Sequence, residues 1–269
     1  MVVGRRRRRP LVWLAATAVL VGITAVCGAA VQTARGVSPV PSWLFAGQDA
    51  TNTRSQADTQ ISTANANRLA VKWVFTTHGD VSATPTVANG IVYFPDFGGY
   101  VNAVDAKTGA LVWQRLTSDV FGPGAVSRTS PAIYGNEVII GDNYAFYQPT
   151  GAHVAALDAR TGATLWKTQV DANPAAQVTA NPVAAAGKLI IGVASNEEAD
   201  TLIPGYPCCT FRGSVVALDP VTGAALWKTW MVPDNGGQPC AEANPAAGCG
   251  YSGGGVWDTP AIDPSTKRV

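Results

Sequence analysis

The sequence has few of the residues that most hydrolases and metalloenzymes need. Among its 269 residues there are only two histidines, His78 and His153, and neither has a cysteine or histidine at the spacing of a zinc site. No nucleophile elbow, phosphate-binding P-loop or dinucleotide-binding fingerprint is present. The glycine-rich stretches Gly98-Gly99 and Gly253–Gly255 are interpreted as β turns and loop. These absences argue against zinc, P-loop and Rossmann chemistry.

Charge is also scarce, at 14% of residues, and the net charge is only +1. Five of the positive charges form one run, Arg5–Arg9, so the rest of the chain is mildly acidic and nothing indicates nucleic-acid binding. Hydrophobic residues make up 47% of the chain, which is typical of a packed globular body. The 28 glycines and 8 tryptophans favour many turns in a repetitive β architecture.

The first 35 residues are predicted to be a targeting segment, either a cleaved signal peptide or an N-terminal membrane anchor. Arg5–Arg9 form a basic region, and the 21 residues of 11–31 carry no charge. Small residues at 28–30 resemble a signal-peptidase site, but the apolar run is also long enough to span a bilayer. The arginines would hold the N-terminus inside. We therefore expect an exported body that is periplasmic or otherwise extracytoplasmic, either secreted or anchored.

The remaining residues contain a repeat. Three segments, 83–113, 130–166 and 181–227, each show strand, turn, strand, turn, strand, tight turn and strand. The tight turn is Asp-x-x-Thr-Gly, in which Asp can accept from backbone N–H groups and Gly supplies a positive φ. Each repeat ends in a tryptophan, at Trp113, Trp166 and Trp227.

A four-stranded sheet cannot bury both of its faces alone, and radial stacking of such sheets solves this problem. The sequence therefore predicts an all-β fold, a β-propeller of four-stranded blades over residues 36–269. A β-sandwich is the alternative, but it does not explain the recurring Thr-Gly-x-x-x-Trp. Trp73 indicates the last strand of one further blade, and residues 256–263 open another. We expect about three blades plus part blades, an incomplete ring.

The repeat Ala-x-Asp-x-x-Thr-Gly-x-x-x-Trp resembles the tryptophan-docking repeat of the PQQ-dependent quinoprotein alcohol dehydrogenases. The resemblance covers roughly residues 43–263 and is strongest to the polyvinyl alcohol dehydrogenase branch, through 85–109, 192–198 and 206–219. Scaffold propellers of the outer-membrane assembly type share the repeat. The resemblance implies the N-terminal part of an exported oxidoreductase that uses PQQ and Ca²⁺.

Four cysteines lie outside the N-terminal segment, and they allow three disulfide pairings. Cα atoms of adjacent residues across a trans peptide are about 3.8 Å apart, whereas ordinary disulfides need about 4.4–6.8 Å. One interpretation therefore pairs Cys208 and Cys209 with Cys240 and Cys249. The resemblance implies instead a Cys208–Cys209 bond that packs on one face of the quinone, together with Cys240–Cys249.

The resemblance assigns further cofactor contacts, each with an ordinary alternative. Trp257 would stack on the opposite face of the quinone, or it is a core tryptophan. Arg212 would bind a quinone carboxylate, or it is a surface arginine. Thr179 and Ser195 would contact the cofactor, or they are ordinary strand and loop residues. Glu197 would ligate Ca²⁺, with Glu198 as an alternative, or it is a solvated loop carboxylate.

The family's catalytic Asp and a Ca²⁺-ligating Asn lie in later blades than the equivalent of Trp257. Asp258 and Asp263 match repeat positions and not that Asp. We therefore expect the chain alone to be inactive and leave its status as an enzyme open. Activity would need a C-terminal propeller half or a second chain, and a cytochrome-type electron acceptor. The alternative function is a non-catalytic extracytoplasmic scaffold that binds proteins.

Overall fold

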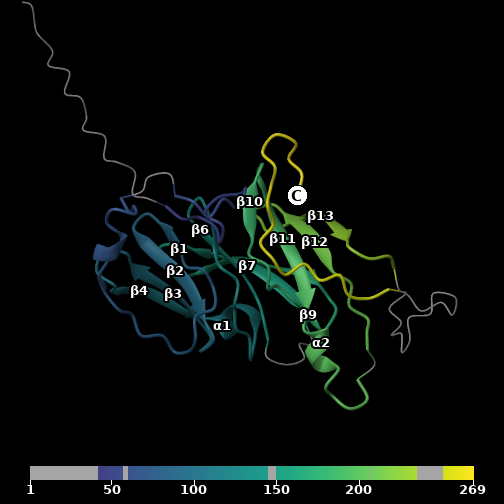
Figure 1. Cartoon of the computed structure of the whole chain (residues 1–269). Coiled ribbons are helices and arrows are strands. Elements are labelled where there is room, and N and C mark those ends of the chain that lie inside the picture. The colour runs from purple at the N-terminus through teal and green to yellow at the C-terminus, as the bar shows by residue number, and fades with distance from the viewer. Residues whose placement is uncertain (1–41, 57–59, 145–149, 207, 235–250) are drawn as a thin grey trace, which may run out of the picture. The chain divides into compact units, whose positions relative to one another are not determined.

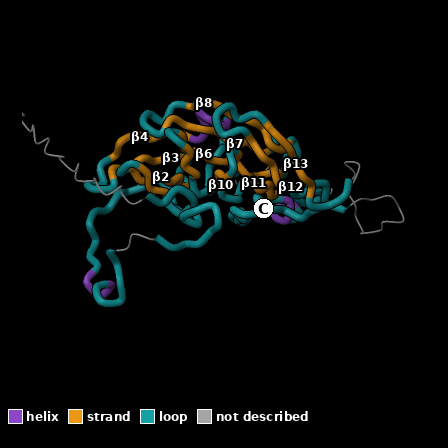
Figure 2. Tube along the Cα trace, turned by 90° about the horizontal axis from the view of Figure 1, so that it is seen from above, coloured by secondary structure: helices purple, strands orange, loops and turns teal. Residues whose placement is uncertain are grey.

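A computed structural model describes residues 42–56, 60–144, 150–206, 208–234 and 251–269. Within them, three antiparallel sheets follow one another along the chain, which the labels of Figures 1 and 2 trace from β1 to β13. The first sheet contains β1 (Thr86–Ala88), β2 (Ile91–Asp96), β3 (Tyr100–Asp105) and β4 (Leu111–Leu116). The second contains β5 (Ala132–Tyr134), β6 (Glu137–Gly141), β7 (Ala152–Asp158) and β8 (Thr164–Asp171). The third contains β10 (Val183–Ala185), β11 (Lys188–Ser195), β12 (Ser214–Leu218) and β13 (Ala225–Trp230), and β9 (Ala176–Gln177) pairs with the end of β11.

Each sheet is a simple meander, so the predicted four-stranded propeller blades are confirmed. Short helices, which the repeat did not predict, occur only between these strands or before them: the 3₁₀ helix η1 (Ala66–Arg68), α1 (Thr117–Phe121) and α2 (Glu197–Asp200). The tight turns have the predicted mechanism. Asp158 Oδ1 accepts from the backbone N of Thr161 at 2.8 Å and from its hydroxyl at 2.8 Å. Gly162 then takes φ +73°, which glycine adopts without a steric penalty.

Neighbouring blades are joined by the repeat tryptophans. Trp113 at the outer strand of the first blade donates from Nε1 to Ala159 O in the second, at 2.9 Å. Trp166 repeats this contact on Pro220 O in the third blade, at 3.2 Å. A Cβ on Gly162 would lie 2.7 Å from the Trp113 ring, so glycine is needed for the close approach as well as for the turn. Trp113 and Trp166 therefore each dock onto the next blade along the chain.

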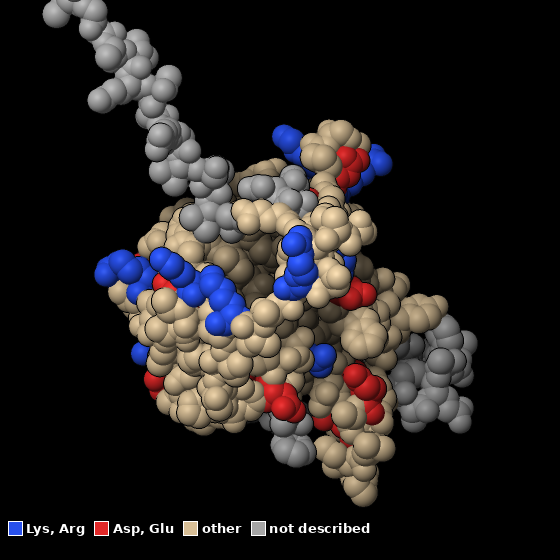
Figure 3. Space-filling model, turned by 60° about the vertical axis from the view of Figure 1, so that its left-hand side comes forward, with Lys and Arg blue, Asp and Glu red and all other residues tan. Residues whose placement is uncertain are grey.

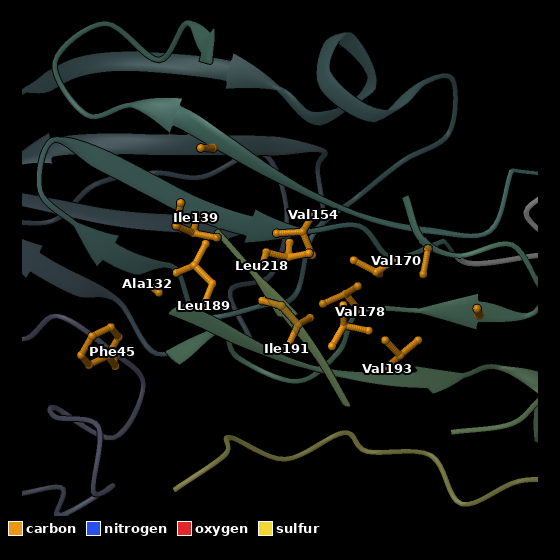
Figure 4. Packing of buried hydrophobic residues seen from close by; sticks show 14 of the residues in the cluster. Phe45, Ala132, Ile139, Val154, Val170, Val178, Leu189, Ile191, Val193 and Leu218 are labelled. Atoms are coloured by element: carbon orange, nitrogen blue, oxygen red, sulfur yellow. The ribbon is translucent and has the colours of Figure 1, made fainter. Parts of the chain in front are cut away.

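The core lies between blades because the side chains of each strand alternate between its two faces. In the second blade, Val138 and Ile140 pack toward the first blade, while Ile139 packs toward the third. Figure 4 shows Ile139 beside Leu189 in the cluster that also contains Val154 and Val178. A strand in the middle blade is thus buried on both faces, which explains its nearly continuous hydrophobic sequence.

The two expected part blades are partly realised. Trp73 docks on the first blade and donates from Nε1 to Ala106 O at 3.1 Å. However, neither residues 69–75 nor residues 256–263 form a strand among the described residues. Trp227, the third docking tryptophan, remains 38% exposed, compared with 9% for Trp113.

Contacts divide the chain into two units, residues 1–38 and 39–269, and every element above belongs to the second unit. The predicted signal or anchor at 1–35 lies outside the described residues. In the part of the chain that the structure describes, no helix has the length and apolar character needed to cross a membrane.

Candidate functional site

The site begins at the prolines that open the blades, Pro85, Pro131, Pro182 and Pro260. The residue before each proline is polar, and these residues link one blade to the next. The backbone N of Thr84 donates to Ser130 Oγ at 2.7 Å, and the backbone N of Ser130 donates to Asn181 Oδ1 at 2.6 Å. Asn181 Nδ2 in turn donates to Thr259 Oγ1 at 2.7 Å. This chain of hydrogen bonds links the residue before the proline in four successive repeats.

The residue two positions earlier in each repeat faces a cavity. These residues are Ser82, Arg128, Thr179 and Trp257. A cavity of about 370 Å³ is lined by the last three of them and by residues at the end of β11 and around residue 254. The described residues that line it are Arg128, Gln177, Thr179, Ala194, Ser195, Asn196, Glu198, Gly253, Gly255 and Trp257. Thr179, Ser195 and Trp257, three of the predicted cofactor residues, are therefore brought together.

Three groups along this cavity have unused binding capacity. Thr179 Oγ1 is buried and has no hydrogen-bond partner, and such an orphaned hydroxyl is costly unless a ligand satisfies it. The guanidinium of Arg128 forms no ion pair with any described residue. The Trp257 side chain is 72% exposed, unlike the docking tryptophans. A planar ligand with acidic groups would satisfy all three.

The two glutamates of α2 have different surroundings. Glu198 lines the cavity, whereas Glu197 is buried and turned toward the loop before β12. Glu197 Oε1 accepts from the backbone N of Thr210 at 2.6 Å, and its Oε2 accepts from the backbone N of Phe211 at 3.1 Å. Glu197, predicted as a calcium ligand, thus holds a loop. Burial raises the pKa of Asp200 in the same helix, with a further contribution from the neighbouring charges of Glu197 and Glu198.

The other predicted residues border neither this cavity nor the one that adjoins it. A disulfide joins Cys208 to Cys209 in the loop that Glu197 holds. Arg212 donates from Nη2 to Val232 O at 3.0 Å, lies 3.3 Å from Asp234 Oδ1, and stacks 4.4 Å from the Trp230 ring centre. Its charge is therefore already satisfied within the chain. Cys240 and Cys249 lie outside the described residues.

Described residues contain no group of three or more His, Cys, Asp or Glu side chains that could hold a metal ion. The described lining of the cavity includes one carboxylate, that of Glu198, and one guanidinium, that of Arg128. Its electrostatics are therefore balanced and suit an organic ligand of mixed polarity more readily than a bare cation.

The chain is similar to known proteins in sequence and in fold. The family model PQQ_2, described as outer membrane protein assembly factor BamB, matches residues 25–203. The chain belongs to the PQQ_2 family. This finding confirms the resemblance seen in the docking repeats.

Relatives of this PQQ_2 chain include dehydrogenases. The polyvinylalcohol dehydrogenase of Pseudomonas sp is 32% identical over 234 residues, which cover 87% of the chain and 36% of the relative. The enzyme of the same name from Sphingopyxis sp. (strain 113P3) is 33% identical over 222 residues, which cover 81% of the chain and 33% of the relative. The crystal structure of the quinohemoprotein alcohol dehydrogenase from Comamonas testosteroni superimposes with a TM-score of 0.63 at 25% identity, over 84% of this chain and 34% of that one. The PQQ_2 chain thus spans about a third of the length of these relatives.

Reasoning from sequence missed Arg128 and Gln177 in the site. The signal for Arg128 was available, because Ser82, Arg128, Thr179 and Trp257 each precede a blade-opening proline by three residues. The repeat alignment started at Ser130 in the second repeat and so excluded the informative position. Gln177 carries no such signal, because it lies in β9, a strand that the repeat does not contain.

Proposed function

We propose that this chain is part of an exported quinoprotein alcohol dehydrogenase and that the 370 Å³ cavity holds PQQ. One observation carries the proposal: the orphaned hydroxyl of Thr179, the unpaired guanidinium of Arg128 and the exposed ring of Trp257 converge on one cavity. A planar quinone with carboxylate groups complements all three. The names and the sequence similarity of the polyvinylalcohol dehydrogenase relatives support the same assignment.

Each residue has a distinct role in the proposal. Trp257 stacks on one face of the quinone, and Arg128 binds a carboxylate through charge-assisted hydrogen bonds. Thr179 and Ser195 offer hydroxyl groups to its polar edge. Arg128 takes the role that the sequence had predicted for Arg212, whose guanidinium is satisfied elsewhere. The Cys208–Cys209 disulfide borders neither cavity and receives no cofactor contact in this proposal.

Bound PQQ would supply the redox chemistry by accepting two electrons from an alcohol. The residues described would bind and orient the quinone and would shield one of its faces from water. No residue among them is assigned as the base that takes the alcohol proton. We propose that this base, and the contact with an electron acceptor such as a cytochrome, come from a further propeller segment or a second chain.

The described residues do not fit the predicted calcium ion. Glu198 is the one carboxylate along the cavity, and Glu197 binds backbone N–H groups instead. Ca²⁺ needs six to eight oxygen ligands, so any such site would draw most of them from outside these residues. No step of the proposal depends on a metal.

Quinone binding can be measured directly. PQQ titrated into the purified chain should quench tryptophan fluorescence with a saturable dependence. Arg128→Gln should weaken binding roughly 10-fold or more, because a charge-assisted hydrogen bond contributes about 1.5–3 kcal/mol. Arg212→Gln is the matched control and should bind PQQ like the native chain. If the native chain does not bind PQQ, or if Arg212→Gln loses binding and Arg128→Gln does not, the assignment is wrong.

A protein-binding scaffold is the second candidate. One observation favours it: the matching family model carries the description of an outer membrane protein assembly factor. A scaffold has no need for the orphaned hydroxyl of Thr179 and the unpaired guanidinium of Arg128 in the 370 Å³ cavity. Absence of PQQ binding by the native chain would favour the scaffold.

A further inference from the structure

A second cavity adjoins the first, and an N-terminal segment closes one side of it. Residues 42–54, here called the strap, cross several blades. Trp43 and Val87 of β1 exchange two backbone hydrogen bonds of 2.8 Å. Ile133 N of β5 donates to Leu44 O at 2.9 Å, and Ile262 N donates to Ala50 O at 2.7 Å. The strap is therefore attached to three separate repeats and has a fixed position over the inner strands.

The end of the strap is held in an uncommon conformation. Asp49 Oδ1 accepts from the backbone N atoms of Thr51 and Thr53, at 3.0 and 3.1 Å. Asn52 and Arg54 both have positive φ, +58° and +54°, a region that non-glycine residues enter only when the surrounding structure imposes it. Arg54 N is bonded to Gly47 O at 2.9 Å. These contacts fix the backbone from which the Arg54 side chain extends.

Arg54 borders the second cavity, of about 220 Å³, whose wall is almost entirely polar. Its lining, among the residues that the structure describes, is Ala46, Arg54, Ser82, Thr84, Arg128, Ser130, Thr179, Asn181, Trp257, Asp258 and Thr259. Arg128, Thr179 and Trp257 line both cavities, so the two are continuous along these side chains. Figure 3 shows basic side chains beside a hollow on one face.

The charges of this cavity favour an anion. Its described lining has two guanidinium groups, those of Arg54 and Arg128, and one carboxylate, that of Asp258. Neither arginine forms an ion pair within the described part of the chain. The same cavity is also lined by serine and threonine side chains, and a planar guanidinium matches the two-oxygen geometry of a carboxylate.

We propose that the 220 Å³ cavity binds a carboxylate group between Arg54 and Arg128. Two sources can supply the group: a carboxylate of PQQ, if its rings fill the first cavity, or a free small dicarboxylate. The PQQ source rests on the proposed function, and the site itself does not. In the PQQ case Arg54 selects the tricarboxylate quinone over uncharged analogues.

The experiment uses the full chain and three probes: PQQ, its trimethyl ester, and oxalate. Arg54→Gln should weaken PQQ binding roughly 10- to 100-fold, as expected for the loss of a charge-assisted hydrogen bond. Arg54→Lys should recover part of the affinity because it restores the charge. The ester, which has no carboxylate, should bind the native chain and Arg54→Gln equally. Arg68→Gln, an exposed arginine of η1 that borders neither cavity, is the control and should not change any affinity.

Oxalate separates the two proposals. If the chain does not bind PQQ, the proposed function fails; the carboxylate site still stands if oxalate raises the melting temperature of the native chain and not that of Arg54→Gln. Unchanged PQQ affinity in Arg54→Gln, with PQQ bound by the native chain, would overturn the PQQ source. The carboxylate site itself would be overturned by two results together. Oxalate would shift the melting temperatures of the native chain and of Arg54→Gln equally or not at all, and the PQQ affinity of Arg54→Gln would be unchanged.

Discussion

The clearest test of how the blades are held together compares two tryptophans at the same repeat position. Trp113 is 9% exposed and bonded to Ala159 O in the next blade, whereas Trp227 is 38% exposed and has no described neighbour blade to dock on. Both end an Asp-x-x-Thr-Gly-x-x-x-Trp repeat. Replacing each with alanine therefore removes the same side chain from the same local structure, with and without a docking partner.

The expected magnitudes differ by several kcal/mol. Trp113→Ala leaves a cavity between two blades and should lower the free energy of unfolding by about 3–5 kcal/mol. Its hydrogen bond adds little to this cost, because Tyr93 also donates to Ala159 O, at 3.1 Å, and keeps that carbonyl satisfied. Trp227→Ala removes a partly solvated ring and should cost roughly 1 kcal/mol or less.

Urea unfolding followed by far-UV circular dichroism measures the comparison, with the midpoint and the slope fitted separately. The slopes should agree if the variants unfold the same surface. Equal losses for the two variants would contradict the argument, because the stability would then come from the tryptophan within its own blade. A larger loss for Trp227→Ala would refute it outright.

Two further predictions concern the tight turns. In the same urea assay, Gly162→Ala should destabilise the chain more than Gly135→Ala, by about 1–3 kcal/mol. Both glycines have positive φ, but a Cβ at 162 overpacks against Trp113, whereas one at 135 meets no atom within 4 Å. Equal effects would show that the docking contact adapts. Hydrogen bonds from Thr108 and Thr161 lower the pKa values of Asp105 and Asp158, and those from Thr222 lower the pKa of Asp219. Because these folded pKa values lie below the unfolded value of about 3.9, the stability they provide is present above that pH and is lost as the pH falls further. The triple variant with Asn at all three positions should flatten the loss of stability below pH ~4, and an unchanged acid profile would contradict this.

The repeat allowed most of the fold to be predicted, because its signals are local. Alternating strands, the Asp-x-x-Thr-Gly turn and the tryptophan four residues later each depend on a few neighbouring residues, and the structure has them as expected. The single extended segment around Trp73 was identified for the same reason, through its docking tryptophan. It forms no strand because strand formation depends on partners, which a local pattern does not include.

The site was harder to predict because it depends on residues that come together only across blades. Thr179, Ser195 and Trp257 were found through family resemblance, and they do share a cavity. Arg212 was predicted as the carboxylate-binding arginine in place of Arg128. The sequence could not show that Asp234 and Val232 already bind the Arg212 guanidinium. Likewise, sequence alone does not distinguish Glu197 from Glu198, since their different surroundings follow from their places in the short helix α2.

The repeat makes the 220 Å³ cavity modular, because its lining includes the residue three positions before each blade-opening proline. Each repeat contributes one side chain to it, at Ser82, Arg128, Thr179 and Trp257. The residue two positions later in each repeat takes part in the inter-blade hydrogen bonds. These positions precede the strands, so substitutions there leave the sheet cores and the docking tryptophans untouched. Evolution or a protein engineer could therefore change what the cavity recognises through four independent substitutions, and the rest of the repeat would continue to hold the scaffold together.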